Sequence, residues 1–293
     1  MSKIEVPGLP RINVVRTGPA GAAPLVFLHP VGLDLTWWGQ QIEEFARDHD
    51  VIAFDMPGHG LSGKADDPAS FEMMADVLHA VLMQLEAGPA HLVGMSVGGM
   101  IAQQFALRQP ELVRSLTLVA TLCTFADPVR ELLRERARVT RTLGMGEIAR
   151  LSNERWFPPA FRQRRPDVLD RATTSLLSRD AEFHASMWDM VSDLDLEGAI
   201  GAIACPTLVI AGTDDGNAPV SAGLKIANAI TGASMKEMTG LGHFPPFESP
   251  EAFNALLREF LVKQRPPDGP SRGSEVSDDG FSSVVRPKIQ ESS

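Results

Sequence analysis

The stretch Gly94-Met95-Ser96-Val97-Gly98 places a serine between two glycines, at a point where a strand is expected to become a helix. The apolar run at 89–93 is typical of a buried strand, and small and apolar residues at helical spacing follow until Pro110. Glycine on either side leaves room for a sharp, strained turn. The pattern therefore predicts an exposed serine hydroxyl above a helix N-terminus, which makes Ser96 a candidate nucleophile.

This five-residue pattern is not decisive by itself. With ordinary frequencies of glycine and serine, a chain of this length would contain it by chance roughly one time in ten. The alternative interpretation is a glycine-rich turn whose serine only caps the following helix. The rest of the chain must decide between the two.

The composition indicates a globular protein and excludes some partners. The chain has 293 residues, of which 44% are hydrophobic, enough for a sizeable core in one large domain or two small ones. A net charge of −10 argues against nucleic acid or an anionic membrane as partner. We expect a cytoplasmic protein, because no signal-peptide core and no apolar run of about eighteen residues is found. Only Cys123 and Cys205 are present, too few for a disulfide framework or a zinc site.

Segments with strand and helix signals alternate along most of the chain. Apolar quartets or short apolar runs predict strands at 25–28, 51–54, 89–93, 116–119 and 207–210. A further strand is expected at 234–238, and 11–15 is a candidate edge strand. Helical spacing predicts helices at 36–47, 69–85, 97–108 and 249–261. This alternation predicts an α/β protein, with a mainly parallel sheet and helices on both of its faces.

Two regions interrupt the alternation. Residues 123–203 lack a buried-strand signal and contain polar helical runs, which predicts a helical lid over the carboxyl ends of the strands, where ligands bind in open α/β sheets. The lid contains twelve arginines and no lysine. Most should lie on a solvated surface, although arginine also suits the bidentate binding of a carboxylate. Residues 1–122 and 204–264 then form the core, and the polar composition of 265–293 predicts a disordered tail.

Two further side chains would complete a serine nucleophile's machinery. A histidine must take the proton of the serine, and an acid must orient that histidine. Asp214 and Asp215 follow the predicted strand at 207–210, and His243 follows the one ending near 238. Of the seven histidines His243 is the one so placed, with a structural loop histidine as the alternative. For the acid we favour Asp215, and expect Asp214 to face solvent or a turn.

The negative charge that develops on a carbonyl oxygen needs two backbone N–H donors. Val97 follows the candidate nucleophile and is the first donor. Val31 is the second, because Pro30 has no N–H and the turn after the strand at 25–28 must point an amide toward Ser96. We expect His29 to hold this loop by hydrogen bonding rather than to act as the base, and His59 to be structural.

Several of these segments together resemble the α/β-hydrolase family, over roughly residues 10–264. The resemblance implies a hydrolase fold with a helical lid, the catalytic triad Ser96, Asp215 and His243, and no metal or organic cofactor. It also selects the acid, because the family's Gly-x-x-Asp-x-x-x-Pro pattern falls on Gly212, Asp215 and Pro219. The segments that carry the resemblance are His29-Pro30-Val31-Gly32, 55–62, 94–100, 212–219 and 242–244.

Within the family the chain is most similar to 3-oxoadipate enol-lactonases, through the segments 32–35, 98–101 and 154–161 together with Trp38. The similarity implies a small lactone or ester as substrate, a role in the breakdown of aromatic compounds, and an enol leaving group that becomes a ketone. The chain departs from the subfamily at Val97, where methionine is frequent, at Pro30, around Trp188 and in its tail.

Other functions stay open at this point. The same triad serves general carboxylesterases, hydrolases that cleave carbon–carbon bonds in ring-cleavage products, and perhydrolases. A non-enzymatic receptor that keeps a hydrolase pocket is a further alternative. Trp38, Trp156 and Trp188 are candidates for an apolar substrate pocket, with core packing as the alternative for each. The sequence leaves a homo-oligomer open.

Overall fold

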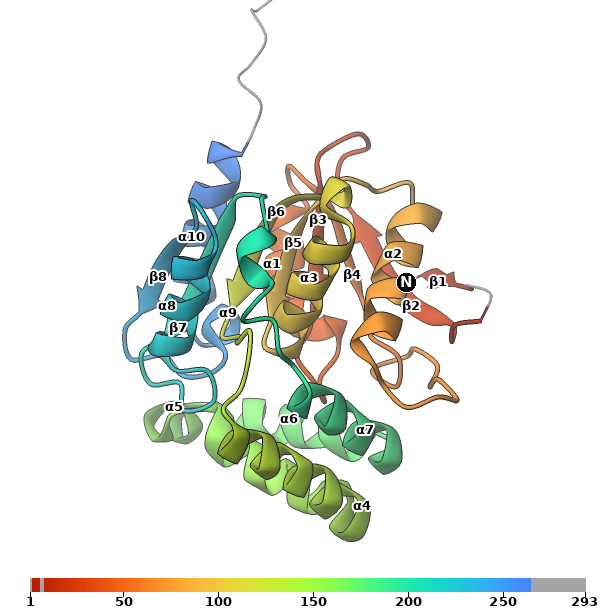
Figure 1. The fold of residues 1–293 in the computed structure, drawn as a ribbon, viewed down its shortest axis with the longest axis vertical. Coiled ribbons are helices and arrows are strands. Elements are labelled where there is room, and N and C mark those ends of the chain that lie inside the picture. Colours follow the sequence, from red (N-terminus) through yellow and green to blue (C-terminus); the bar gives the residue numbers. More distant parts are fainter. Residues whose placement is uncertain (1, 6–7, 265–293) are drawn as a thin grey trace, which may run out of the picture.

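The computed structural model describes residues 2–5 and 8–264, so the tail expected at 265–293 lies outside the described residues. Eight strands form one sheet in the order β1-β2-β4-β3-β5-β6-β7-β8. β1 and β2 are antiparallel to their neighbours, and the strands from β4 to β8 pair in parallel (Figure 1). The expected α/β fold with a mainly parallel sheet is confirmed.

Most strands and helices of this core lie where the apolar patterns predicted them. Among the strands and α-helices of this core, those not predicted are β1, which is too short to show a pattern, α8 and the short α9. The helix expected at 36–47 begins instead with a 3₁₀ turn at Leu35–Trp38. The strands are β1 (Ser2–Ile4), β2 (Ile12–Thr17), β3 (Pro24–Leu28), β4 (Asp50–Phe54), β5 (Ala90–Met95), β6 (Val113–Val119), β7 (Thr207–Gly212) and β8 (Ser234–Met238). The helices around them are α1 (Gly39–Phe45), α2 (Phe71–Gln84), α3 (Val97–Arg108), α8 (Val220–Ala229), α9 (Pro245–Glu248) and α10 (Pro250–Lys263).

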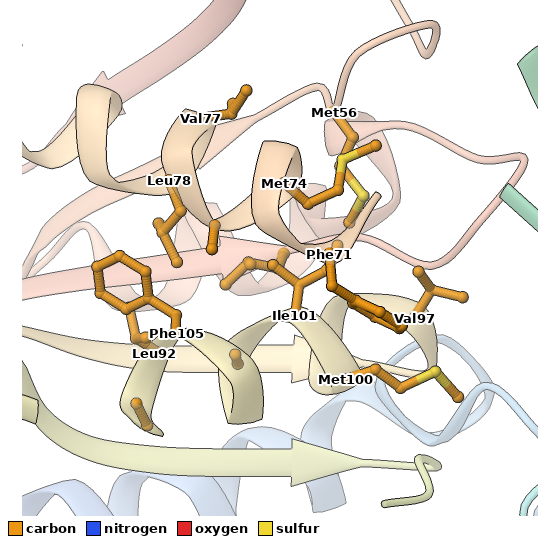
Figure 2. Close-up of a cluster of buried hydrophobic side chains, with 14 of the residues drawn as sticks. Met56, Phe71, Met74, Val77, Leu78, Leu92, Val97, Met100, Ile101 and Phe105 are labelled. Atoms are coloured by element: carbon orange, nitrogen blue, oxygen red, sulfur yellow. The ribbon is translucent and has the colours of Figure 1, made fainter. Parts of the chain in front are cut away.

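Helices cover both faces of the sheet, because successive side chains of a strand point to opposite faces. In β3, Val26 and Leu28 belong to the cluster that includes α2 and α3, whereas Leu25 and Phe27 belong to the cluster that includes α1 and α10. Figure 2 shows side chains of α2 and α3 pointing toward one another beside the sheet. Fully burying one apolar side chain of this kind contributes about 1.5–3 kcal/mol to the stability of the fold. The two clusters therefore stabilise the sheet from both faces and fix the positions of its strand ends.

Four helices between β6 and β7 form the region that we call the lid. They are α4 (Asp127–Trp156), α5 (Pro159–Arg164), α6 (Pro166–Leu177) and α7 (Ala181–Ser192), and they gather beyond one end of the sheet in Figure 1. The long helix α4 is interrupted at Gly144, whose φ of 73° is open to glycine and costly for other residues. Within the described ranges, none of the helices combines the length and apolar character needed to cross a bilayer.

Candidate active site

Ser96 lies in the turn that joins β5 to α3, and its backbone is strained. Its φ of 52° and ψ of −119° are unusual for a residue with a side chain. A Cβ at Gly94 would collide with the backbone of Gly98, and a Cβ at Gly98 would collide with the carbonyl of Leu28. Both glycines are therefore required by close backbone approach, which is how this sequence can turn so sharply.

Three side chains from distant loops form one chain of hydrogen bonds. His243 Nε2 lies 3.1 Å from Ser96 Oγ, and His243 Nδ1 lies 2.8 Å from Asp215 Oδ2. The rings and carboxylate are shielded, since His243 and Asp215 are each only 4% exposed. Asp214 is turned away: its exposed carboxylate accepts a hydrogen bond from Thr213 instead. The structure thus brings together the three side chains that the sequence selected.

The surroundings of Asp215 keep its carboxylate charged. Burial raises its pKa, but the attraction and hydrogen bond of His243, with the amides of Asn217 and Ala218, hold the pKa below its usual value. Those two amides donate to Oδ1 at 2.7 and 3.1 Å. A charged carboxylate at Nδ1 requires that nitrogen to carry the proton, which leaves Nε2 free to accept from the serine hydroxyl.

The backbone on either side of His243 is held by a half-buried acid that sequence reasoning missed. Glu248 Oε2 accepts the amide of Gly242 at 2.9 Å, and Oε1 accepts the amide of Phe244 at 2.9 Å. Burial raises the pKa of Glu248, while these two amides lower it. The amide of His243 itself donates to the carbonyl of Trp156 at 3.0 Å. Backbone amides carry no residue signature, so the sequence gives no direct signal of this clamp.

The loop that carries Val31 is held by two buried imidazoles. Each donates from Nδ1 to a nearby backbone carbonyl. At Nε2, His29 accepts the amide of Met56 at 2.9 Å, and His59 accepts the amide of Gly32 at 3.0 Å. These bonds need neutral rings, and burial lowers the pKa of both histidines. The structural roles expected for His29 and His59 are confirmed.

A pocket opens above Ser96 between the sheet and the lid. Val31, Val97 and His243 line it on the side of the core. On the lid side its wall is mainly apolar, with side chains from 122–133 and Val191. The charged side chains on the wall, besides a histidine, are Arg136 and Arg155. Val97 is the first residue of α3, where a backbone N–H has no partner within the helix.

The three tryptophans expected at the pocket differ in position. Trp156 and Trp188 line it. Trp38 does not, and that expectation is corrected: its side chain is 2% exposed and packs in the core, with its ring 4.9 Å from that of Phe27 and 6.3 Å from that of Phe253. Its large apolar surface is buried against the sheet and α10, so core packing, the alternative for this residue, applies.

The end of α4 is bonded to the loops of both partners of the serine. Arg155 Nε donates to Asn217 Oδ1 at 3.1 Å, and Asn217 Nδ2 donates to the Arg155 carbonyl at 2.9 Å.

A family model described as the alpha/beta hydrolase fold matches residues 23–250. The chain belongs to the α/β-hydrolase family. The resemblance expected from the motifs is confirmed.

Two of the relatives are named as an enol-lactonase and a hydrolase, and the match covers at least 90% of each. 3-Oxoadipate enol-lactonase 2 of Acinetobacter baylyi is 28% identical over 252 residues, which cover 86% of this chain and 93% of that one. The 2-hydroxy-6-oxononadienedioate/2-hydroxy-6-oxononatrienedioate hydrolase of Cupriavidus pinatubonensis is 28% identical, with 86% and 90% covered. The crystal structure of an enol-lactonase from Burkholderia xenovorans superposes with a TM-score of 0.85 at 27% identity, covering 89% of this chain and all of that one.

Proposed function

We propose that the protein is a serine hydrolase that opens a small lactone through an acyl-enzyme, as an enol-lactonase does. The observation that carries the proposal is the hydrogen-bond chain from Ser96 through His243 to Asp215, at the floor of a pocket. The similarity to two enol-lactonases, one in sequence and one in structure, supports the lactone as substrate. The geometry of the site supports the reaction class, hydrolysis by a serine nucleophile. The similarity to these relatives supports the choice of substrate.

In the first half of the reaction, His243 Nε2 takes the proton of Ser96 Oγ as that oxygen attacks the substrate carbonyl. The charge on the carbonyl oxygen is then held by the amides of Val31 and Val97, and removal of one such donor typically costs about 3 kcal/mol. Asp215 stays ionised and stabilises the imidazolium that forms. The strained turn holds the hydroxyl above the helix, so little reorganisation is needed.

In the second half the tetrahedral intermediate collapses. The ring oxygen leaves, receives the proton from His243, and an acyl-enzyme on Ser96 remains. A water molecule then attacks with His243 again as base, which releases a carboxylic acid and restores the serine. If the leaving oxygen belongs to an enol, that enol tautomerises to a ketone, and because the two halves of an opened lactone stay joined, the product is an oxo acid.

One relative favours a second candidate function. The Cupriavidus enzyme is named as a hydrolase of a 2-hydroxy-6-oxo dienedioate, so cleavage of a carbon–carbon bond on the same three residues is the rival that a comparison supports. Carboxylesterase and perhydrolase activities use the same triad, and a receptor without turnover would keep the same pocket.

Rates on three substrates separate these functions. We would measure kcat/KM for an enol-lactone, a para-nitrophenyl ester and a 2-hydroxy-6-oxo dienoate, with wild-type protein and Ser96→Ala. Fastest turnover of the enol-lactone, lost in Ser96→Ala, is the expected result. Slow turnover of the lactone beside fast turnover of the ester would favour a carboxylesterase, and beside fast turnover of the dienoate a carbon–carbon bond hydrolase. No turnover of any of the three would favour a receptor without enzymatic activity.

A further inference from the structure

The chain that follows β6 leaves the sheet through a strained turn beside the nucleophile. Among the described residues, the non-glycine residues with a positive φ are Glu86, Ser96 and Ala120. Ser96 and Ala120 lie at neighbouring strand ends, because Met95 pairs with Val119 in the sheet. A positive φ is costly for alanine and persists only where the surrounding structure imposes it. The second strained residue at this place therefore needs a reason.

The turn at Ala120 brings a hydroxyl to the backbone of Ser96. The amide of Ala120 donates to the carbonyl of Ile210 at 2.9 Å, which holds the turn against β7. Thr121 follows, and its Oγ1 donates to the carbonyl oxygen of Ser96 at 2.7 Å. The side chain of Thr121 is 3% exposed and does not line the pocket. Its hydroxyl therefore acts on the protein and not on a substrate.

Helix α3 leaves space for this threonine at Gly99. A Cβ at Gly99 would lie 2.8 Å from Cβ and 2.9 Å from Oγ1 of Thr121. Any larger residue at position 99 would push the threonine away from the carbonyl of Ser96. The close approach of Gly99 and Thr121 is thus a condition for the hydrogen bond.

The carbonyl that Thr121 binds shares its peptide unit with the N–H of Val97. This peptide bond is trans and planar, so the C=O and the N–H point in opposite directions. The carbonyl of Ser96 also accepts the amide of Met100 at 3.1 Å, in the first turn of α3 (Figure 2), and so points along the helix. The N–H of Val97 then points out of the helix N-terminus, toward the pocket that Val97 lines. Fixing the oxygen therefore fixes the direction of the N–H.

The same hydrogen bond strengthens the N–H as a donor. A carbonyl that accepts hydrogen bonds is more polarised, and the N–H of its peptide unit becomes a better donor, by roughly 10–30% per bond. The carbonyl of Ser96 accepts two such bonds, from Thr121 and Met100. A stronger donor matters most in the transition state, where negative charge develops on the substrate oxygen.

We propose that Thr121 is a positioning residue of the oxyanion hole. Its hydroxyl orients and polarises the peptide unit between Ser96 and Val97, so that the N–H of Val97 meets the charge that develops on the substrate oxygen. The strained turn at Ala120 is retained because it places this hydroxyl. The inference rests on the proposed hydrolase function and adds a residue that does not contact the substrate.

The first test compares Thr121→Ser with Thr121→Ala. Both variants lack the γ-methyl group, so they differ only in the hydroxyl. On an enol-lactone and on para-nitrophenyl acetate, Thr121→Ser should stay within about twofold of wild type. Thr121→Ala should have a kcat about 3- to 10-fold below that of Thr121→Ser, with little change in KM, because the lost interaction acts in the transition state. Equal values of kcat in the two variants would overturn the inference.

A matched pair at the other end of the sheet controls for stability. Thr207 is also buried, and its hydroxyl donates to a backbone carbonyl, that of Cys205, at 3.0 Å. It begins β7, whereas the site lies where β7 ends. Thr207→Ser and Thr207→Ala should have equal kcat, with any difference between them confined to urea unfolding. A loss of kcat in Thr207→Ala as large as in Thr121→Ala would show a general effect of stability and would count against the proposal.

A second measurement separates the N–H of Val97 from the hydroxyl of Ser96. In the thionoester analogue of para-nitrophenyl acetate, sulfur replaces the carbonyl oxygen, and sulfur is a weak hydrogen-bond acceptor. The ratio of kcat/KM between Thr121→Ser and Thr121→Ala, followed by release of para-nitrophenol, should fall to less than about twofold on the thionoester. An equal ratio on the ester and the thionoester would place the effect on the nucleophile and overturn the inference.

Failure of the proposed function would give a different result. In that case the wild-type protein would hydrolyse neither the enol-lactone nor the ester, or Ser96→Ala would keep the activity. A wild-type protein that depends on Ser96, beside variants of Thr121 that match each other, would refute only the role of Thr121.

Discussion

The edge of the sheet that carries Ser96, Asp215 and His243 and the lid wall of the pocket satisfy their polar groups differently. At the edge, the nitrogens of His243 and both oxygens of Asp215 have partners, all from the core. On the lid wall and behind it, Nε of Arg136 and Nδ1 of His184 have none among the described residues. The difference teaches that the hydrogen-bond chain of Ser96, His243 and Asp215 is complete within the core, whereas the lid wall presents a cation to the pocket without an acid among the described residues of that wall.

The largest expected effect is the loss of kcat when the hydrogen-bond chain in the core is broken. Asp215→Asn and His243→Ala should each lower kcat by roughly 10⁴-fold, because the base loses its orientation or is absent. Asp214→Asn is the matched control, since its carboxylate is exposed and faces Thr213; it should stay within about twofold of wild type. Steady-state rates on an enol-lactone check both. A loss in Asp214→Asn as large as in Asp215→Asn would mean that the acid is misassigned.

A smaller expected effect is the contribution of His184, in the lid, to the pH dependence of stability. Burial, followed by Arg136 and Arg179, lowers the pKa of His184 to about 3, so the folded protein keeps this ring neutral. The unfolded chain binds a proton near pH 6.5, so stability is lost as pH falls below that value toward the folded pKa. His184→Gln keeps an acceptor for Trp188 and should remove about 2–3 kcal/mol of the stability loss between pH 7 and about 4.5.

Urea unfolding at the two pH values measures this difference. The buried rings of His29 and His59 are present in both proteins, so their contributions cancel in the comparison. An identical pH dependence in wild type and His184→Gln would show that His184 is not held neutral beside Trp188, whose Nε1 donates to it at 3.0 Å.

The smallest of these effects concerns the clamp behind His243. Glu248→Gln leaves one oxygen to accept and presents an amide nitrogen to a backbone N–H, so one of the two bonds is lost. We expect kcat to fall about tenfold with little change in KM, consistent with one hydrogen bond to a charged group. Glu259→Gln, an exposed change on α10, is the control. A rise in KM at constant kcat would place Glu248 in substrate binding instead of in positioning the base.

The core side could be predicted from the sequence for a physical reason. A buried parallel strand needs a short apolar run, and the loop after it must turn at the same edge as its neighbours, so Ser96, Asp215 and His243 were expected to meet. The Ser96 turn also needs glycines, and these can be recognised directly in the sequence. The prediction for Trp38 was wrong: its side chain is buried in the core. The sequence could not separate the two positions, because an aromatic side chain suits a core and a pocket equally well.

The lid side could not be predicted in the same detail. Twelve arginines are present there, and helical spacing does not say which one faces a cavity without an acid beside it. That distinction for Arg136 depends on how α4 and α7 pack, through Ser152 and Trp188. Glu248 was missed for a related reason, since its partners are backbone amides.

The most direct measurement of this division between core and lid is labelling with a fluorophosphonate, read by intact-protein mass spectrometry. Wild-type protein should gain one adduct and Ser96→Ala none. Arg138→Met should gain one adduct at close to the wild-type rate, because this arginine of α4 is exposed, pairs with Glu135 and does not line the pocket. An adduct retained in Ser96→Ala would contradict the assignment of the nucleophile. An adduct lost in Arg138→Met would contradict the separation of the lid surface from the chemistry.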